Sequence, residues 1–308
     1  MGQMILQDRS ASGRVRPWAE NKMSNEILAA AYESVDLDKA ERLRSCASFL
    51  QYRKDASGVM RLYRANFCRV RLCPICTWRR SLKLTAQATQ VIDYARKVKP
   101  QAYAMLTLTV PSCTADDLSD LISKMSLGWH KLSNYKAFGQ AVRGYLRSME
   151  VTHNTDNDTY HPHYHVLLQV APSYFKSRYY LSQAAWLDMW RRAMQDDTIT
   201  QVDVRRVKGD TIHAIAEVAK YACKPTDYII PNDWDMTVDT VAVLDQALNK
   251  RRFVGWGGDL KAYRQRLGLD DVEDGDLLQS DGHDNIDDRD MVEIVYWWYP
   301  GYRQYRAG

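Results

Sequence analysis

The chain has 308 residues and a formal net charge of +4, with 45% hydrophobic and 26% charged residues. These are the values of an ordinary globular protein, long enough for one large domain or two smaller ones. The first residues lack the apolar core of a signal peptide and no run of about 18 apolar residues could span a bilayer, so we expect a cytoplasmic protein without a membrane partner.

The charge is distributed unevenly along the chain. Residues 270–293 contain eleven acidic side chains and one basic side chain, whereas residues 1–266 contain 39 basic and 27 acidic ones. A basic body with a short acidic segment favours a polyanionic partner. A solvated surface followed by an acidic stretch explains the charge equally well.

Apolar periodicity and turn residues predict helices interleaved with strands. In chain order, we expect a polar N-terminal region with a helix at 25–35, then a helix at 76–98, a strand at 102–111, a helix at 116–132, strands at 144–153 and 161–170, a helix at 181–194, a strand at 200–207 and a helix at 211–224. Ser182 is the expected N-cap of the helix at 181–194. Consecutive strands joined by a short polar turn form a hairpin, so the pattern predicts an α+β fold around a mainly antiparallel sheet.

Four of the six cysteines lie close together in the sequence. Cys46, Cys68, Cys73 and Cys76 have the spacing C-x21-C-x4-C-x2-C, and the last pair is in LCPICTWRR. A CxxC turn can place two thiolates on one tetrahedral ion, so this set predicts a structural zinc site. The alternative is that all four are small buried core residues, as free cysteines often are.

Three histidines stand within five positions in HPHYHVLLQV, at the start of a predicted strand. Side chains alternate along a strand, so His163 and His165 share one face. If the hairpin pairs residues whose numbers sum to 313, Glu150 lies opposite His163 on that same face. Two imidazoles and a carboxylate could hold Mg²⁺ or Mn²⁺. A half-exposed strand with solvated histidines is the alternative, and His161 is a weaker ligand candidate.

The predicted helix TIHAIAEVAKYACK places polar side chains on one face. This face carries His213, Glu217, Lys220, Tyr221 and Lys224. A tyrosine is a phosphoryl-transfer nucleophile when nearby cations favour its phenolate, and a glutamate on the same face could deprotonate a water. A solvated surface stripe would have the same composition.

Taken together, these residues resemble the HUH endonucleases, and more narrowly the rolling-circle plasmid replication initiators (Rep) with one catalytic tyrosine and a glutamate four residues before it. The resemblance covers residues 46–258 in the same order, through ANFCRVRLCPICTWRRSLK, MLTLTVP, YLRSMEVTHN, HPHYHVLL and EVAKYACK. It implies an HUH-type central antiparallel sheet flanked by helices, RRM- or palm-like, with an N-terminal four-cysteine zinc element.

The resemblance also implies the roles of individual residues. His163, His165 and Glu150 would be the ligands of a divalent metal, Tyr221 the nucleophile and Glu217 the base that activates water for termination. The tyrosine would nick origin DNA, single-stranded or extruded, and keep the 5′ phosphate as a phosphotyrosine while a free 3′-OH remains. Candidate DNA contacts are Lys220, Lys224, Arg79, Arg80 and Lys83, with Arg205, Arg206 and Lys208 as further basic residues.

The implied organisation has four segments: an N-terminal extension at 1–40, a zinc-binding element and helix at 41–98, an HUH nuclease domain at 99–266 and an acidic, aromatic tail at 267–308. The implied partners are a host helicase, a polymerase and a single-strand-binding protein. Three alternatives stay open: an HUH transposase or relaxase acting on other mobile DNA, a non-catalytic zinc protein that binds nucleic acid, and a metal-dependent hydrolase of small phosphoesters.

Overall fold

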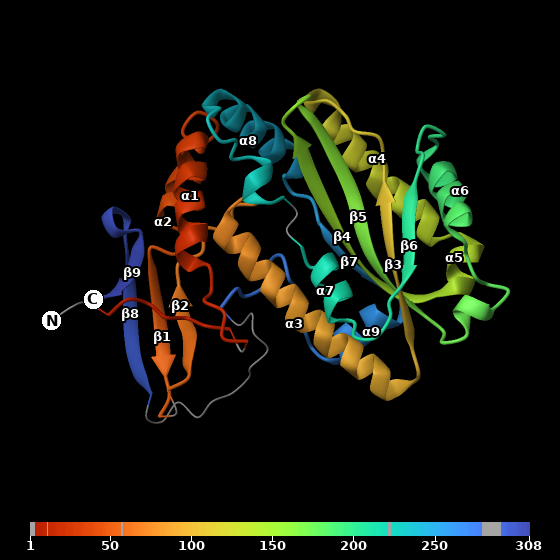
Figure 1. Cartoon of the computed structure of the whole chain (residues 1–308), viewed down its shortest axis with the longest axis horizontal. Coiled ribbons are helices and arrows are strands. Elements are labelled where there is room, and N and C mark those ends of the chain that lie inside the picture. Colours follow the sequence, from red (N-terminus) through yellow and green to blue (C-terminus); the bar gives the residue numbers. More distant parts are fainter. Residues whose placement is uncertain (1–3, 11, 57, 221–222, 279–290) are drawn as a thin grey trace. The chain divides into compact units, whose positions relative to one another are not determined.

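The computed structural model describes residues 4–10, 12–56, 58–220, 223–278 and 291–308 (Figure 1). The chain forms two compact units, which we describe separately. Unit 1 comprises Met1–Lys83, Tyr228–Asp245 and Asp276–Gly308, and unit 2 comprises Leu84–Asp227 and Gln246–Gly275.

Helices and strands alternate along the described chain. The helices are α1 (Trp18–Tyr32), α2 (Leu37–Ser45), α3 (Pro74–Val98), α4 (Ala115–Ser133), α5 (Lys136–Ala141), α6 (Gln183–Met194), α7 (Ile212–Val218), α8 (Trp234–Leu248) and α9 (Gly258–Arg266). The strands are β1 (Phe49–Lys54), β2 (Met60–Ala65), β3 (Ala102–Thr109), β4 (Val142–Asn154), β5 (Thr159–Val170), β6 (Val202–Arg206), β7 (Val254–Gly257), β8 (Val292–Tyr299) and β9 (Gln304–Ala307). Short 3-10 turns are η1 (Tyr174–Lys176), η2 (Pro225–Asp227) and η3 (Pro300–Tyr302).

Unit 2 is built on a five-stranded sheet of order β6-β3-β5-β4-β7, in which every pair of neighbours is antiparallel. Antiparallel sheets flanked by helices confirm the predicted α+β class. β5 is the central strand, and from Pro162 to Val170 every residue is buried. A strand covered on both faces needs no polar alternation, which explains the unbroken apolar run after the histidines.

The β4–β5 hairpin has the register in which the numbers of paired residues sum to 313, the one considered from the sequence. Glu150 pairs with His163, Met149 with Tyr164 and Ser148 with His165. The left-handed backbone of Asp158, with φ of 48°, helps close the turn between the two strands. Because side chains alternate, this register places Glu150 on the same face of the sheet as the two histidines.

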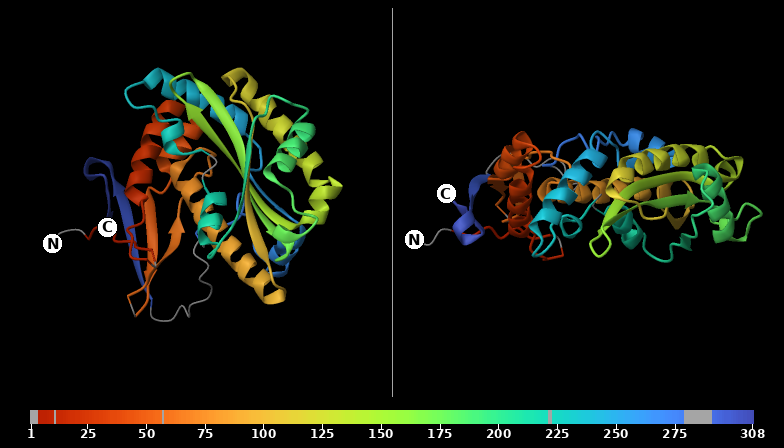
Figure 2. Two further views of the ribbon diagram at one scale, coloured as in Figure 1. Left: turned by 45° about the vertical axis from the view of Figure 1, so that its right-hand side comes forward. Right: turned by 90° about the horizontal axis from the view of Figure 1, so that it is seen from above.

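Helices cover both faces of the sheet (Figures 1 and 2). The face that carries the histidines packs on α3 and α7 through a cluster of apolar side chains: Leu84, Ala88, Ile92, Met105, Leu146, Leu167, Ile215 and Val218. On the opposite face, the ring centroid of Tyr164 lies 6.0 Å from that of Trp129 on α4 and 6.5 Å from that of Trp190 on α6. The two faces therefore have separate cores, and the sheet is rigidly held between them.

The helices on the second face follow their sequence signals closely. Ser182 caps α6 as predicted, accepting a hydrogen bond of 3.2 Å from the amide of Ala185. Gly128 of α4 lies so close to α6 that a Cβ there would stand 2.5 Å from the sulfur of Met194. A larger residue there would have to displace the flexible end of the Met194 side chain, and its Cβ would lie 3.3 Å from the ring of Trp190.

Unit 1 is built on a four-stranded antiparallel sheet of order β2-β1-β8-β9. Its inner face is buried and packs on α1, where Trp18 meets Tyr305 at 6.5 Å and Trp298 donates to Glu26 at 2.5 Å. β8 and β9 lie more than 230 residues after β1 in the sequence, yet β8 pairs with it (Figure 1). The aromatic C-terminal segment is therefore a structural part of the same unit as the cysteines.

Several elements differ from the sequence predictions. The helix expected at 211–224 ends at Val218, and Ile212, expected on its buried face, is 56% exposed. The amide of Lys224 donates to the carboxylate of Asp227 at 2.7 Å, so this segment bonds to a side chain instead of continuing the helix. Helix α8 had no counterpart in the sequence prediction, and α1 begins seven residues earlier than the expected helix at 25–35.

Candidate functional site

A carboxylate and two imidazoles converge on the α3–α7 face of the unit 2 sheet. Glu150 Oε2 lies 3.0 Å from His165 Nε2 and 3.4 Å from His163 Nε2. One ligand atom from each residue falls within 4.8 Å of the others, so this group could bind a metal ion. The side chains of Glu150 and His165 are 4% and 9% exposed, and that of His163 is 11% exposed.

The ring of His163 is oriented by its own strand. His163 Nδ1 lies 3.1 Å from the carbonyl oxygen of His161, which leaves Nε2 to face Glu150. A second hydrogen bond of this kind fixes the tautomer of a metal-binding histidine. The ring of His161 stacks on that of His163, with 5.3 Å between the ring centroids. Burial lowers the pKa of His161, and the neighbouring imidazole of His163 lowers it further. His161 is not part of the potential ligand group, although its carbonyl helps to build it.

Lys224 supplies the positive charge nearest to Glu150. Its Nζ lies 2.7 Å from Glu150 Oε1, on the opposite side of the carboxylate from the histidines. Burial alone would raise the pKa of the Glu150 carboxyl, but hydrogen bonds from His163, His165 and Lys224 outweigh it and hold this pKa far below its usual range. The same hydrogen bond to Glu150 raises the pKa of Lys224. Glu150 is therefore ionised, as a metal ligand must be.

Glu217 of α7 also reaches this group. Its Oε1 lies 3.8 Å from His165 Nδ1 and 2.5 Å from Lys220 Nζ, and its side chain is 28% exposed. The short helix brings Glu217 to the histidines because α7 packs on β5. Tyr221, the predicted nucleophile, lies outside the described residues, and its neighbours Lys220 and Lys224 both pair with acidic groups of the site.

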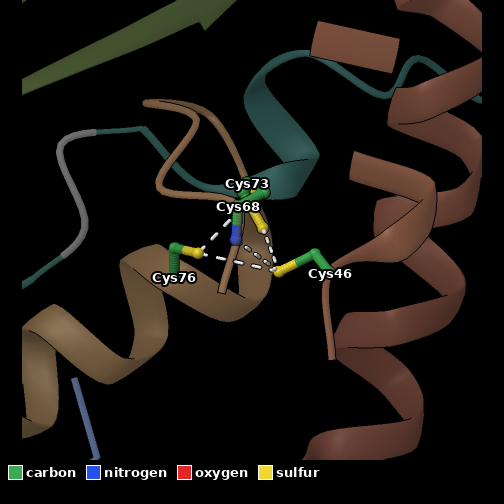
Figure 3. A group of neighbouring side chains, drawn as sticks. All are labelled: Cys46, Cys68, Cys73 and Cys76. Carbon is green, nitrogen blue, oxygen red and sulfur yellow. Dashed lines mark hydrogen bonds between the residues drawn. The ribbon is translucent and has the colours of Figure 1, made fainter. Parts of the chain in front are cut away.

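The four clustered cysteines lie together in unit 1, as Figure 3 shows. Cys46 Sγ is 3.6 Å from Cys73 Sγ and 3.7 Å from Cys76 Sγ, and Cys68 Sγ is 3.8 Å from Cys76 Sγ. Four sulfurs at about 2.3 Å from a tetrahedral zinc ion stand about 3.8 Å from each other, whereas a disulfide brings two sulfurs to about 2 Å. The cysteine set therefore fits a tetrahedral metal.

The electrostatics of the cysteines favour a cation among them. Burial raises the pKa of the Cys73 thiol, whereas in Cys76 the effect of burial is outweighed by hydrogen bonds from the other three sulfurs and by the charge of Arg80, which bring its pKa below the usual range. Backbone amides of Cys68 and Arg69 donate to two of the sulfurs, at 3.4 and 3.3 Å. The pKa of Cys46 is raised as well, so without a cation Cys46 and Cys73 would stay protonated, and a positive ion is what would hold all four as thiolates.

Two polar residues of α1 support the cysteines and were not predicted from the sequence. Lys22 is 1% exposed and donates to the carbonyls of Arg44 and Cys46, at 2.8 and 2.7 Å. Asn25 is fully buried, and its Oδ1 lies 3.1 Å from Cys73 Sγ. Their i, i+3 spacing could have indicated that both side chains lie on one face of a helix. Nothing in the sequence indicates that this helix packs against the cysteines.

Replacing Cys73 with serine is expected to release the metal and destabilise unit 1. A loss of about 3 kcal/mol would lower the unfolding midpoint by roughly 5 °C in a chain of this size. Elemental analysis of the purified protein and a thermal melt measure the two effects. Cys113→Ser is the matched control, since Cys113 is a half-buried thiol outside the cluster. Full metal content in Cys73→Ser would exclude the tetrahedral site.

The basic residues predicted as DNA contacts differ in accessibility. Arg79 is 2% exposed and donates to the carbonyls of Leu277 and Leu278, and Lys83 is 3% exposed and donates to that of Asp276. Arg79 and Lys83 therefore hold the chain after residue 275 to α3 and present no free charge to DNA. Arg80 is half-buried. The remaining basic residues, Arg205 and Arg206 on β6 and Lys208 after it, are exposed.

The chain matches known replication proteins over most of its length. Residues 59–306 match the family model described as replication protein (Rep_1). A Protein rep from Bacillus amyloliquefaciens is 38% identical over 98% of this chain and 96% of its own length. A Protein rep from Lentilactobacillus hilgardii is also 38% identical, over 97% of this chain and 97% of its own length. A Protein rep from Streptococcus pneumoniae is 36% identical over 96% of this chain and 92% of its own length.

No solved structure matches the chain significantly. None of the helices in the described ranges combines the length and the hydropathy needed to cross a bilayer. Both groups that could bind a metal lie within or close to the matched region, and the three relatives named above are covered nearly end to end. The chain therefore belongs to the replication protein family Rep_1.

Proposed function

We propose that this protein initiates rolling-circle plasmid replication as an HUH-type endonuclease that nicks and rejoins origin DNA in the cytoplasm. The observation that carries the proposal is the convergence of Glu150, His163 and His165 on neighbouring strands, with 3.0 and 3.4 Å between carboxylate and imidazoles, in a chain of the replication protein family. We place the nuclease domain at residues 99–266.

Glu150, His163 and His165 would hold a divalent cation such as Mn²⁺ or Mg²⁺. When bound, the ion supplies positive charge to the oxygens of the scissile phosphate. The residues fit this role because the carboxylate is ionised, both Nε2 atoms face it, and the ring of His163 is held from behind by the His161 carbonyl.

Tyr221 would act as the nucleophile on the phosphate. Its phenol oxygen forms a bond to phosphorus while the P–O3′ bond breaks, the phenol loses its proton, and the departing 3′ oxygen becomes a hydroxyl. The product is a 5′ phosphotyrosine and a free 3′-OH that a host polymerase can extend. The covalent bond conserves the energy of the phosphodiester, so rejoining the strand needs no nucleoside triphosphate.

Glu217 would serve the termination step. A second cleavage at the regenerated origin needs a nucleophile other than Tyr221, and water deprotonated by Glu217 can fill that role. The position of Glu217, 3.8 Å from His165, supports this assignment because it keeps the base beside the predicted metal. Lys224, whose side chain is 41% exposed beside Glu150, is proposed to contact the phosphate, and Lys220 likewise beside Glu217.

The remaining parts of the chain have supporting roles in this proposal. Zinc bound by the four cysteines would stabilise the element at 41–98. Since all four coordination positions would be filled by protein ligands, this ion would have no catalytic role. Origin DNA, single-stranded or extruded as a hairpin, is the substrate, and a host helicase, polymerase and single-strand-binding protein are the proposed partners.

Incubation with labelled single-stranded origin oligonucleotides and Mn²⁺ tests the function. A denaturation-resistant protein–DNA adduct and a shorter product ending in 3′-OH are expected. Mass spectrometry of the digested adduct should locate the DNA on Tyr221 among the nineteen tyrosines. A protein that binds the oligonucleotides but never forms an adduct, with any tested origin fragment, would be a non-catalytic binder.

A further inference from the structure

The outward face of the unit 1 sheet is rich in aromatic and arginine side chains. Leu50, Tyr52, Tyr296 and Tyr305 are buried on the inner face, so their neighbours along each strand point outward. The register of the sheet gives the outward residues: Phe49, Gln51 and Arg53 on β1, Arg61 and Arg64 on β2, Glu293, Val295 and Trp297 on β8, and Arg306 on β9.

One row of these residues crosses three strands, and an arginine of the fourth strand reaches it diagonally. Phe49 lies opposite Trp297, and Trp297 lies opposite Arg306. The rings of Phe49 and Trp297 are 5.6 Å apart and tilted by 46°. Arg64 pairs with Gln51 on β1, two residues from Phe49, and its guanidinium lies 5.8 Å from the centre of the Phe49 ring. With strands about 4.8 Å apart, the four strands that carry these residues span about 14 Å.

Further aromatic rings stand beside this row with arginines against them. The guanidinium of Arg53 lies 3.4 Å from the ring centre of Tyr63, and that of Arg306 lies 3.6 Å from the ring centre of Tyr302. Trp297, Tyr63 and Tyr302 are 48%, 45% and 61% exposed. Large rings with this much open surface are held in place by the sheet and by the arginines, so they are preorganised for a flat ligand.

The outward face is positively charged. Among the described strand residues on this face, Arg53, Arg61, Arg64 and Arg306 stand against one carboxylate, that of Glu293, which pairs with Arg53 at 3.0 Å. Three positive charges remain over a face four strands wide. Aromatic and arginine side chains also occur in protein–protein interfaces, but three positive charges without acidic partners among the described residues of the same face favour a polyanion.

We propose that the outward face of β2-β1-β8-β9 binds single-stranded DNA, with Phe49 and Trp297 stacking on unpaired bases while Arg64 and Arg306 contact the flanking phosphates. Aromatic platforms on a sheet, bordered by basic residues, bind single strands because every base offers a flat face and every nucleotide a phosphate. In a duplex the bases stack on each other, so the rings would add nothing and only the arginines would contribute.

This surface is separate from the nicking chemistry, which the site on unit 2 would perform. It would give a replication protein a second binding site for the single strand that becomes exposed when the origin opens. It goes beyond the proposed function, and it does not require that any bond in the DNA be cut. Binding can therefore be tested with an oligonucleotide that carries no origin sequence and without added Mn²⁺.

The test is fluorescence anisotropy of a labelled oligothymidylate of about 20 nucleotides with the full-length protein. Trp297→Ala is expected to weaken binding about tenfold, the usual loss when one stacking ring is removed, and Trp297→Phe should keep most of the affinity. Binding of a duplex of the same length should change less than about twofold for both variants. Trp234→Ala is the matched control, because Trp234 is 49% exposed on α8 and should not affect binding.

Arg64→Glu keeps the test decisive if the tryptophan variant is poorly folded. It should weaken binding of the single strand and reduce the slope of log affinity against log salt by at least about 0.7, the change for one lost phosphate contact. Unchanged affinity in both Trp297→Ala and Arg64→Glu would overturn the proposal, as would an equal loss on single-stranded and duplex DNA. The nuclease activity is measured separately, as adduct formation on origin fragments. Failure of the single-strand-binding test can therefore be distinguished from failure of the proposed nuclease function.

Discussion

Replacing Tyr221 with phenylalanine is expected to abolish both nicking and the covalent protein–DNA adduct while leaving origin binding intact. The variant differs by one oxygen atom, which is the atom that would form the bond to phosphorus. Loss of a nucleophile removes the covalent route entirely, so a fall of at least about 10³-fold in adduct yield is expected, down to the background of the assay. Denaturing gels with 5′- and 3′-labelled origin oligonucleotides measure the two products separately.

The matched control for this prediction is Tyr180→Phe, which removes a hydroxyl from another exposed tyrosine, 48% accessible, on the loop before α6. This variant should nick like the unmodified protein. Adduct formation by Tyr221→Phe at the unmodified rate would assign the nucleophile to a different residue. Loss of DNA binding together with nicking would show instead that the phenol has a structural role.

Replacing Glu150 with glutamine is expected to reduce metal-dependent nicking by about 10²-fold or more. The amide has the size of the carboxylate but no charge, so it is a poor ligand for a hard divalent cation and no longer balances Lys224 and the two histidines. Nicking rates measured over a range of Mn²⁺ concentrations should show a higher half-saturation point. Electron paramagnetic resonance of free Mn²⁺ measures the lost affinity without any reaction.

Asp188→Asn is the control for Glu150→Gln, because it neutralises a carboxylate that makes only an exposed ion pair with Arg192 on α6. It should leave the metal dependence unchanged. Equal Mn²⁺ affinity in Glu150→Gln and the unmodified protein would mean that the carboxylate orients the imidazoles but does not bind the ion. In that case the two histidines would need a different third ligand.

The geometry of the β4–β5 hairpin was predictable because it depends on local information. Strand alternation fixes which residues share a face, and a short turn limits which residues can pair. The pairing of Glu150 with His163 could therefore be considered from the sequence, although the turn allowed other registers, and the structure has that pairing. The cysteine cluster was predictable for a similar reason, since the CPIC turn brings two sulfurs together by itself. The wider α+β class followed from the order of the strand and helix patterns.

Other features depend on contacts that the sequence pattern does not report. The helix at 211–224 has an unbroken amphipathic pattern, but it ends at Val218, and the Lys224 amide bonds to Asp227. Arg79 and Lys83 look like surface charges in a basic stretch, yet both bind backbone carbonyls almost 200 residues away in the chain. Long-range partners of this kind override local propensity, and only a three-dimensional structure identifies them.

The pairing of β1 with β8 has a consequence for how the protein is made. Arg53 and Glu293, neighbours in that pairing, are 240 residues apart, so β1 leaves the ribosome long before its partner has been synthesised. Until then the nascent chain presents the free edge of β1, which can pair with a second chain. Contacts between such distant segments form slowly. A chain that ended before residue 292 would lack β8 and β9 and could not complete the sheet. We therefore expect synthesis of residues 292–307 to be the event that commits unit 1 to its native structure.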